Sequence, residues 1–148
     1  MTALVQETSV TVVRRFLDAL NAWDFDVMAE LFDSDLVFEL PFAPPGLVTR
    51  IQGGREFLEF VRRVPEVFDE ERLHDIAING FADDPHEVVA EYRSDMNVVA
   101  TGGKYQNRYV ARFTVRDGKL TRFVEYCDPI PLLEALGGRV EFDGSGSI

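Results

Sequence analysis

The change in hydrophobic period along the chain constrains its fold more than any other feature. Residues 5–22 place apolar side chains at the three- and four-residue spacing of a helix with one buried face. From Arg72 onward the period changes to two, which is typical of strands whose side chains alternate between two faces. Helices concentrated at one end of a chain and strands at the other predict an α+β domain.

Two more helices are predicted before the strands begin. Asp24 caps the second helix, whose inward side chains extend to Phe32. Residues 33–35, Asp-Ser-Asp, then predict a turn, and residues 36–40 predict a strand that ends at Pro41.

A loop and the third helix follow. Residues 41–52 contain three prolines and one glycine, so we expect a loop long and apolar enough to form the lip of a cavity. Residues 55–64 carry apolar side chains on one side of a helix, and Pro65 is expected to begin the exit from it.

The strand region predicts a curved antiparallel sheet. Its four runs are separated by turn sequences and cover residues 73–78, 87–99, 104–115 and 119–127. A short helix over residues 129–136 follows. Three helices do not cover the concave face of such a sheet, so a pocket between helices and sheet is expected. Residues 1–140 are predicted to form one domain, with a flexible tail over residues 141–148.

Charge and cysteine usage exclude several classes of protein. The 148 residues carry a net charge of −11, which disfavours a nucleic-acid or anionic membrane partner because phosphate binding needs clustered Lys and Arg. The single cysteine, Cys127, excludes an internal disulfide and a multi-cysteine metal site. Neither a signal peptide nor a membrane-length apolar run is present in the sequence, which predicts a cytoplasmic protein. The two histidines are too separated to suggest a metal site, and the sequence has no phosphate loop or dinucleotide fingerprint, so no metal and no cofactor are expected.

The first half of the chain resembles the ketosteroid isomerase branch of the nuclear transport factor 2-like superfamily. Residues 14–42 and the GGREFLEFV stretch from Gly53 carry the resemblance, with Asp24, Glu39, Pro41 and the Gly54-Arg55-Glu56 helix start retained. The three working positions of that isomerase depart from its pattern. Its catalytic base falls on Leu40, the phenol of its oxyanion hole on Phe16, and the acid of that hole on Ala111. Ketosteroid isomerase activity itself is therefore not expected.

The second half is similar to phenazine-biosynthesis proteins and SnoaL-like polyketide cyclases. The shared features are Tyr105-x-Asn107, Asp117-Gly118, Glu125 within VEYCDP, and the end from Leu133 to Gly137. The resemblance implies a cone-shaped, cystatin-like α+β barrel. It also implies a working acid at Glu125, whereas the histidine and serine of the phenazine proteins fall on Val61 and Pro65.

Candidate site residues follow from strand alternation and from the resemblance. Glu125, Asn107 and Tyr109 are predicted to be catalytic, because a lone carboxyl among apolar neighbours has a raised pKa and amide and phenol groups orient a charged oxygen. Pairing of Glu125 with Arg93 or Arg108 is the structural alternative. His74 is a minor catalytic candidate. The predicted substrate-binding residues are Phe16, Trp23, Leu40, Phe42, Phe57, Val61, Tyr105, Ala111, Phe123 and Cys127.

Two main hypotheses about function remain open at this point. The first is a cofactor-independent cyclase, isomerase or dehydratase that moves a proton on a small hydrophobic or aromatic ligand within a hydrophobic pocket. Secondary metabolism is the expected setting for such an enzyme. The second is a non-catalytic binding or accessory protein of the same fold. A structural dimer with a filled core is a third, weaker reading.

A homodimer is also predicted. Val88, Ala90, Tyr92, Met96 and Val98 alternate along one strand, and an apolar stripe left uncovered by the helices would favour face-to-face pairing of two sheets. Which face of residues 87–99 points outward is not determined by the sequence.

Overall fold

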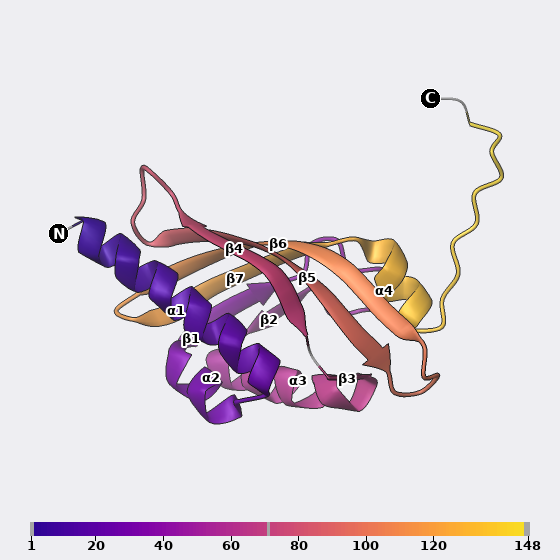
Figure 1. Cartoon of the computed structure of the whole chain (residues 1–148), viewed down its shortest axis with the longest axis horizontal. Helices are drawn as coiled ribbons and strands as arrows, with labels where there is room; N and C mark the ends of the chain where they lie inside the picture. The colour runs from indigo at the N-terminus through magenta and orange to yellow at the C-terminus, as the bar shows by residue number, and fades with distance from the viewer. Residues whose placement is uncertain (1, 71, 147–148) are drawn as a thin grey trace.

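The computed structural model describes residues 2–70 and 72–146 of the chain (Figure 1). In these residues the helices are α1 (Thr2–Ala22), α2 (Phe25–Leu31), α3 (Gly54–Val67) and α4 (Pro129–Ala135). The strands are β1 (Phe32–Glu39), β2 (Arg50–Gln52), β3 (Phe68–Asp69), β4 (Leu73–Gly80), β5 (Glu87–Val98), β6 (Lys104–Arg116) and β7 (Lys119–Cys127). The predicted α+β cone is confirmed.

The strands form a single curled sheet with α1, α2 and α3 on one side of it and α4 near its end (Figure 1). The strand order is β2-β1-β7-β6-β5-β3, and β4 also pairs with β5. The sheet is mixed rather than wholly antiparallel, because β1 runs parallel to β7. After β1 and β2, helix α3 leads the chain to β3 at the opposite edge of the sheet. The antiparallel strands β5, β6 and β7 then bring the chain back to β1, and β7 runs in the same direction as β1.

Local signals set most element boundaries, with three corrections. The predicted loop over residues 41–52 ends in β2, whose three residues pair with β1. The Asp24 carboxylate accepts a hydrogen bond from the Val27 N–H and starts α2 as predicted. The predicted turn at residues 33–35 lies inside β1, where the pairing with β7 shifts register between Phe32 and Val37. Helix α3 continues past Pro65 to Val67, since a proline removes only its own N–H bond and Phe68 N–H still donates to Val64.

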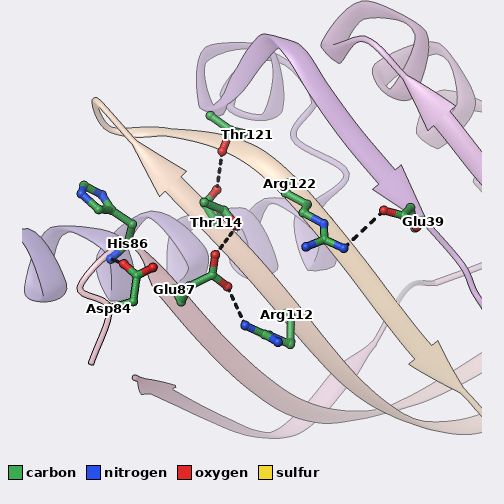
Figure 2. Close-up of polar contacts among 8 residues, drawn as sticks. All are labelled: Glu39, Asp84, His86, Glu87, Arg112, Thr114, Thr121 and Arg122. Atoms are coloured by element: carbon green, nitrogen blue, oxygen red, sulfur yellow. Dashed lines mark hydrogen bonds and ion pairs between the residues drawn. The ribbon is translucent and has the colours of Figure 1, made fainter. Parts of the chain in front are cut away.

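The apolar stripe on β5 faces the core, so the predicted outward stripe is wrong. Val88 and Ala90 are fully buried, and Tyr92, Met96 and Val98 are at most 4% exposed. Most of the alternate positions carry charge, and all of them are at least partly exposed. Figure 2 shows part of this outer face, where Glu87 accepts hydrogen bonds from Arg112 (3.0 Å) and Thr114 (2.6 Å). Hydration of these charges decides which face of β5 points outward.

A cluster of packed aromatic rings fills the closed part of the cone. Phe16 of α1 is fully buried and meets Phe32, Phe113 and Phe123 edge to face at 5.3–6.0 Å. These contacts fix α1 across the concave face and leave the other end of the cone, toward α4, less densely filled.

The C-terminal segment after α4 has neither helix nor strand over residues 138–146 and runs away from the domain (Figure 1). Residues 147–148 of the predicted tail lie outside the described residues. Within residues 2–70 and 72–146, no helix combines the length and the apolar character needed to cross a membrane.

Candidate active site in the cone

A cavity of about 170 Å³ lies between the sheet and helices α1 and α3. Its floor is the concave face of β5, β6 and β7, and its roof is formed by apolar side chains of the two helices. Because this space remains open, the reading of a protein with a completely filled core is wrong. Ten of the thirteen predicted site residues line it: Phe16, Trp23, Leu40, Phe57, Val61, Tyr105, Tyr109, Phe123, Glu125 and Cys127.

Three predicted site residues lie elsewhere. Phe42 is 57% exposed and packs edge to face on Tyr126, outside the cavity. Ala111 is fully buried in the sheet beside Glu125 and does not reach the cavity. Asn107 is buried beyond the cavity lining, where its amide bonds to Tyr105 and to the main chain of Arg108 and Asp128. The sequence analysis placed Asn107 and Ala111 on the correct face of β6, but neither side chain reaches the cavity.

Glu125 of β7 is the one carboxyl group among the described residues that line the cavity. Its side chain is partly accessible, and the space it faces is the cavity. Burial raises its pKa from the ordinary 4.5 to about 7, and a hydrogen bond from the Tyr92 hydroxyl opposes part of that rise. Glu125 is therefore present in both protonation states near neutral pH, as an acid–base group must be.

The partner of Glu125 is a tyrosine rather than an arginine. Tyr92 of β5 reaches over β6 to donate to the Glu125 carboxylate. Between them on β6 lies Ala111, which pairs with Glu125 across the strands, and its short methyl group leaves room for that contact. The arginine alternative is wrong at Arg93, whose guanidinium instead lies 3.9 Å from the Asp75 carboxylate, and Arg108 is exposed on the outer face.

A chain of hydroxyl groups runs along the cavity floor beside this pair. The Ser94 and Tyr109 hydroxyls are 2.9 Å apart, and Tyr109 donates to the Tyr105 oxygen at 3.1 Å. The Asn107 amide donates to the same oxygen at 2.7 Å. Burial, followed by the neighbouring Tyr105 and then Glu125, raises the pKa of Tyr109 well above its usual value, and burial raises the pKa of Tyr105 in the same direction. Both phenols therefore remain protonated donors across the physiological range.

Nine residues that line the cavity were not predicted as site residues, and Tyr92 is the most important of them. The remaining eight are Leu20, Phe38, Phe60, Val64, Phe68, Leu73, Met96 and Leu132. A signal for Tyr92 was present in the sequence. Glu91 and Arg93 flank it, and since charged side chains belong outside the sheet, the tyrosine between them belongs inside.

The other reactive candidates do not take part in this geometry. His74 pairs with Asp75 at 3.3 Å on β4 and does not line the cavity. Cys127 does line it, but burial raises its pKa to about 12, so it remains an uncharged thiol. No group of three or more His, Cys, Asp or Glu side chains suited to a metal ion occurs in residues 2–70 and 72–146.

Replacing Tyr92 with phenylalanine is expected to raise the pKa of Glu125 by about one unit. The lost hydrogen bond favours the carboxylate, and such bonds to charged groups are worth about 1.5 kcal/mol. Carbon-13 NMR titration of labelled glutamate carboxyl groups would follow the shift. Tyr126→Phe is the matched control because Tyr126 lies on the other face of the same sheet. An unchanged or lowered Glu125 pKa in Tyr92→Phe would show that the Tyr92 bond does not stabilise the carboxylate.

Comparison with known proteins places this geometry in a family. The SnoaL-like domain matches residues 13–123. The Bacillus subtilis protein YesE, itself uncharacterised, is 30% identical over 132 residues, which is 89% of each chain. An uncharacterised PhzA/B-like protein of Pseudomonas aeruginosa is 33% identical over 109 residues, covering 74% of this chain and 76% of its own.

Solved structures share the fold. A Bacillus subtilis protein provisionally classed as an isomerase superposes with a TM-score of 0.81 at 29% identity, covering 90% of this chain and 95% of its own. NTF2-like proteins are also among the matching structures. The family match extends over three quarters of the chain and includes α3 and most of the strands that carry the cavity. The chain therefore belongs to the SnoaL-like domain family of the NTF2-like fold.

Proposed function

We propose that this protein is a cofactor-independent enzyme that moves a proton on a small hydrophobic substrate, as a cyclase, isomerase or dehydratase does. The observation that carries the proposal is Glu125, a carboxyl group with a pKa of about 7 that faces an apolar cavity. In its ionised state Glu125 takes a proton from the substrate, and in its protonated state it returns one to another atom. Proton transfer of this kind needs no group other than the side chain.

Tyr105 is the best placed donor for an oxygen that gains charge during the reaction. Its oxygen already accepts hydrogen bonds from Tyr109 and Asn107, so its own proton remains for the cavity. Donation from Ser94 through Tyr109 would polarise Tyr105 further. In this arrangement Asn107 and Tyr109, the predicted catalytic partners of Glu125, orient the Tyr105 hydroxyl through the hydrogen bonds that they donate to its oxygen.

The experiment that tests this function is proton exchange in heavy water. Cyclohexanone and cyclohex-3-enone carry acidic hydrogens beside a carbonyl, and NMR follows their replacement by deuterium. We expect the wild-type protein to accelerate exchange in at least one such compound and Glu125→Gln to do so far less. Equal acceleration by the two proteins would remove Glu125 from the mechanism.

A non-catalytic binding protein is the alternative, and the same assay distinguishes it. The cavity is lined by many aromatic side chains, which would hold a ligand whether or not it reacts. Binding of the ketones without any protein-dependent exchange would favour this alternative. A cytoplasmic location and a role in secondary metabolism belong to the same proposal.

A homodimer remains part of the proposal, through a different surface from the buried stripe. On the outer face Val110 of β6 is 45% exposed and lies opposite Tyr126 of β7, on which Phe42 packs. The outer face also carries charges of both signs, with Arg122 lying 3.5 Å from Glu39 and Arg112 bonded to Glu87 (Figure 2). Such a mixed surface is able to pair with a second copy of itself about a two-fold axis.

The dimer prediction is tested by light scattering at micromolar concentration. We expect a mass of twice 16.7 kDa for the wild-type chain and a shift toward 16.7 kDa for Val110→Glu, which places a charge at the centre of the apolar group. Val48→Glu is a matched control, because Val48 is equally exposed but lies in the loop before β2. A wild-type mass near 16.7 kDa would rule the dimer out.

A further inference from the structure

We infer that the cavity takes an uncharged compound with one ring and a single oxygen that faces Glu125 and Tyr105. This inference deepens the proposed function by naming its substrate class. Three properties of the cavity carry it: its volume, the absence of basic side chains from its described lining, and the separation of its polar and apolar walls.

The volume limits the ligand to about one ring. A cavity of about 170 Å³ is close in size to an engineered apolar cavity of about 150 Å³ that holds benzene. Four fused rings would have to extend beyond it into solvent or displace the rings of Phe57 and Phe68, both less than 10% exposed. Phe57 stacks on Phe38 at 4.6 Å and Phe68 on Tyr105 at 4.6 Å, so neither ring moves without losing a packed partner.

The charge of the lining excludes anions. Among the described residues that line the cavity there is no Lys, Arg or His, and the only ionisable carboxyl is that of Glu125. A carboxylate or phosphate inside would lose its hydration, gain no cation and meet a second negative charge. Arg62 of α3 does not line the cavity, and its guanidinium lies over the Phe25 ring at 5.0 Å.

The two walls determine the orientation of the ligand. The helical wall contributes hydrocarbon from Phe16, Leu20, Phe57 and Val61, whereas the hydroxyl and carboxyl groups all lie on the sheet wall. A ligand with one polar end therefore places that end on the sheet. An ammonium group would be attracted by ionised Glu125, but it would bring three donors to a wall whose other polar groups are phenols, and Tyr92 already occupies one Glu125 oxygen. The N–H groups left without an acceptor would lose their hydration, so an uncharged oxygen is the better match.

Intrinsic fluorescence provides a direct binding assay, because Trp23 is the only tryptophan in the chain and lines the cavity. The probes are benzyl alcohol, benzoate and benzylammonium, which share one ring and differ in charge, together with estradiol as a four-ring compound. At pH 8 we expect benzyl alcohol to bind roughly 100-fold more tightly than benzoate and also more tightly than benzylammonium and estradiol.

Two variants identify the source of the discrimination. Glu125→Gln removes the negative charge and is expected to narrow the gap between benzyl alcohol and benzoate by about tenfold or more, while benzyl alcohol binding changes only a few-fold. Glu91→Gln, on the outer face of β5, is the matched control and should leave the gap unchanged. If Glu125→Gln leaves the affinity difference between benzyl alcohol and benzoate as large as Glu91→Gln does, Glu125 does not exclude anions.

The binding panel and the exchange assay fail independently. Benzoate, benzylammonium or estradiol binding as tightly as benzyl alcohol would overturn the inferred ligand class even if the protein catalyses exchange. Tight and selective binding of benzyl alcohol, combined with no Glu125-dependent exchange in any ketone, would leave the ligand class standing and overturn the proposed enzyme activity.

Discussion

Replacing Glu125 with glutamine is expected to reduce the rate of proton transfer by about 10²–10⁴-fold. A positioned general acid–base group contributes acceleration of this size, and glutamine keeps the shape of the side chain while removing the proton-accepting oxygen. In the wild type the rate of a base-catalysed exchange should rise with pH and level off above about 7, where the buried carboxyl is ionised. The measurement is deuterium exchange of a cyclic ketone across pH 5–9.

Two further variants make this result specific. Glu125→Asp retains a carboxylate but withdraws it by one methylene, so we expect a partial loss with the pH dependence kept. Glu91→Gln alters a carboxylate on the outer face of the neighbouring strand and should leave the rate within twofold of wild type. A pH profile that stays flat in the wild type, or one that survives in Glu125→Gln, would assign the chemistry to another group.

Strand alternation, together with the family resemblance, was sufficient to predict that Glu125 faces the inside of the cone, because alternation along one strand needs only local information and the resemblance identifies the concave face. Phe123, Glu125 and Cys127 share a face, and placing one of them inside the cone places all three. The same reasoning was wrong for β5, because an alternating strand does not by itself say which face meets the helices. The flanking charges of Glu91 and Arg93 carried that information.

Contacts between distant strands could not be predicted. The Tyr92–Glu125 pair joins β5 to β7 across β6, and it depends on strand order, on register and on a small residue at Ala111. The sequence also did not indicate which side chains on the inner face of a strand reach the cavity. Asn107 lies between Tyr105 and Tyr109 on the same face of β6, yet only the two tyrosines reach the cavity. The asparagine side chain is shorter, and its amide is held by the Tyr105 hydroxyl and the main chain of Asp128.

Glutamine at position 125 is also expected to stabilise the fold at alkaline pH. In the folded protein Glu125 holds its proton up to pH about 7, whereas in the unfolded chain it loses it near 4.5. Between these values the folded state binds more protons than the unfolded state, so the free energy of unfolding falls as pH rises. The loss is complete above pH 7 and amounts to about 3 kcal/mol, at roughly 1.4 kcal/mol per pKa unit. An uncharged amide at this position undergoes no such loss.

Chemical denaturation at pH 5 and pH 8 measures the effect as a difference between two proteins, which cancels the titration of the other groups. We expect wild type and Glu125→Gln to differ by less than about 1 kcal/mol at pH 5, and the variant to be more stable by up to about 3 kcal/mol at pH 8. Glu91→Gln, whose carboxylate is exposed, should track the wild type at both values. A variant that is less stable than wild type at pH 8 would mean that the folded protein favours the ionised form of Glu125. The group would then be a structural anion. If Glu125→Gln is more stable than wild type and also loses proton exchange, the Glu125 charge destabilises the fold and is required for catalysis.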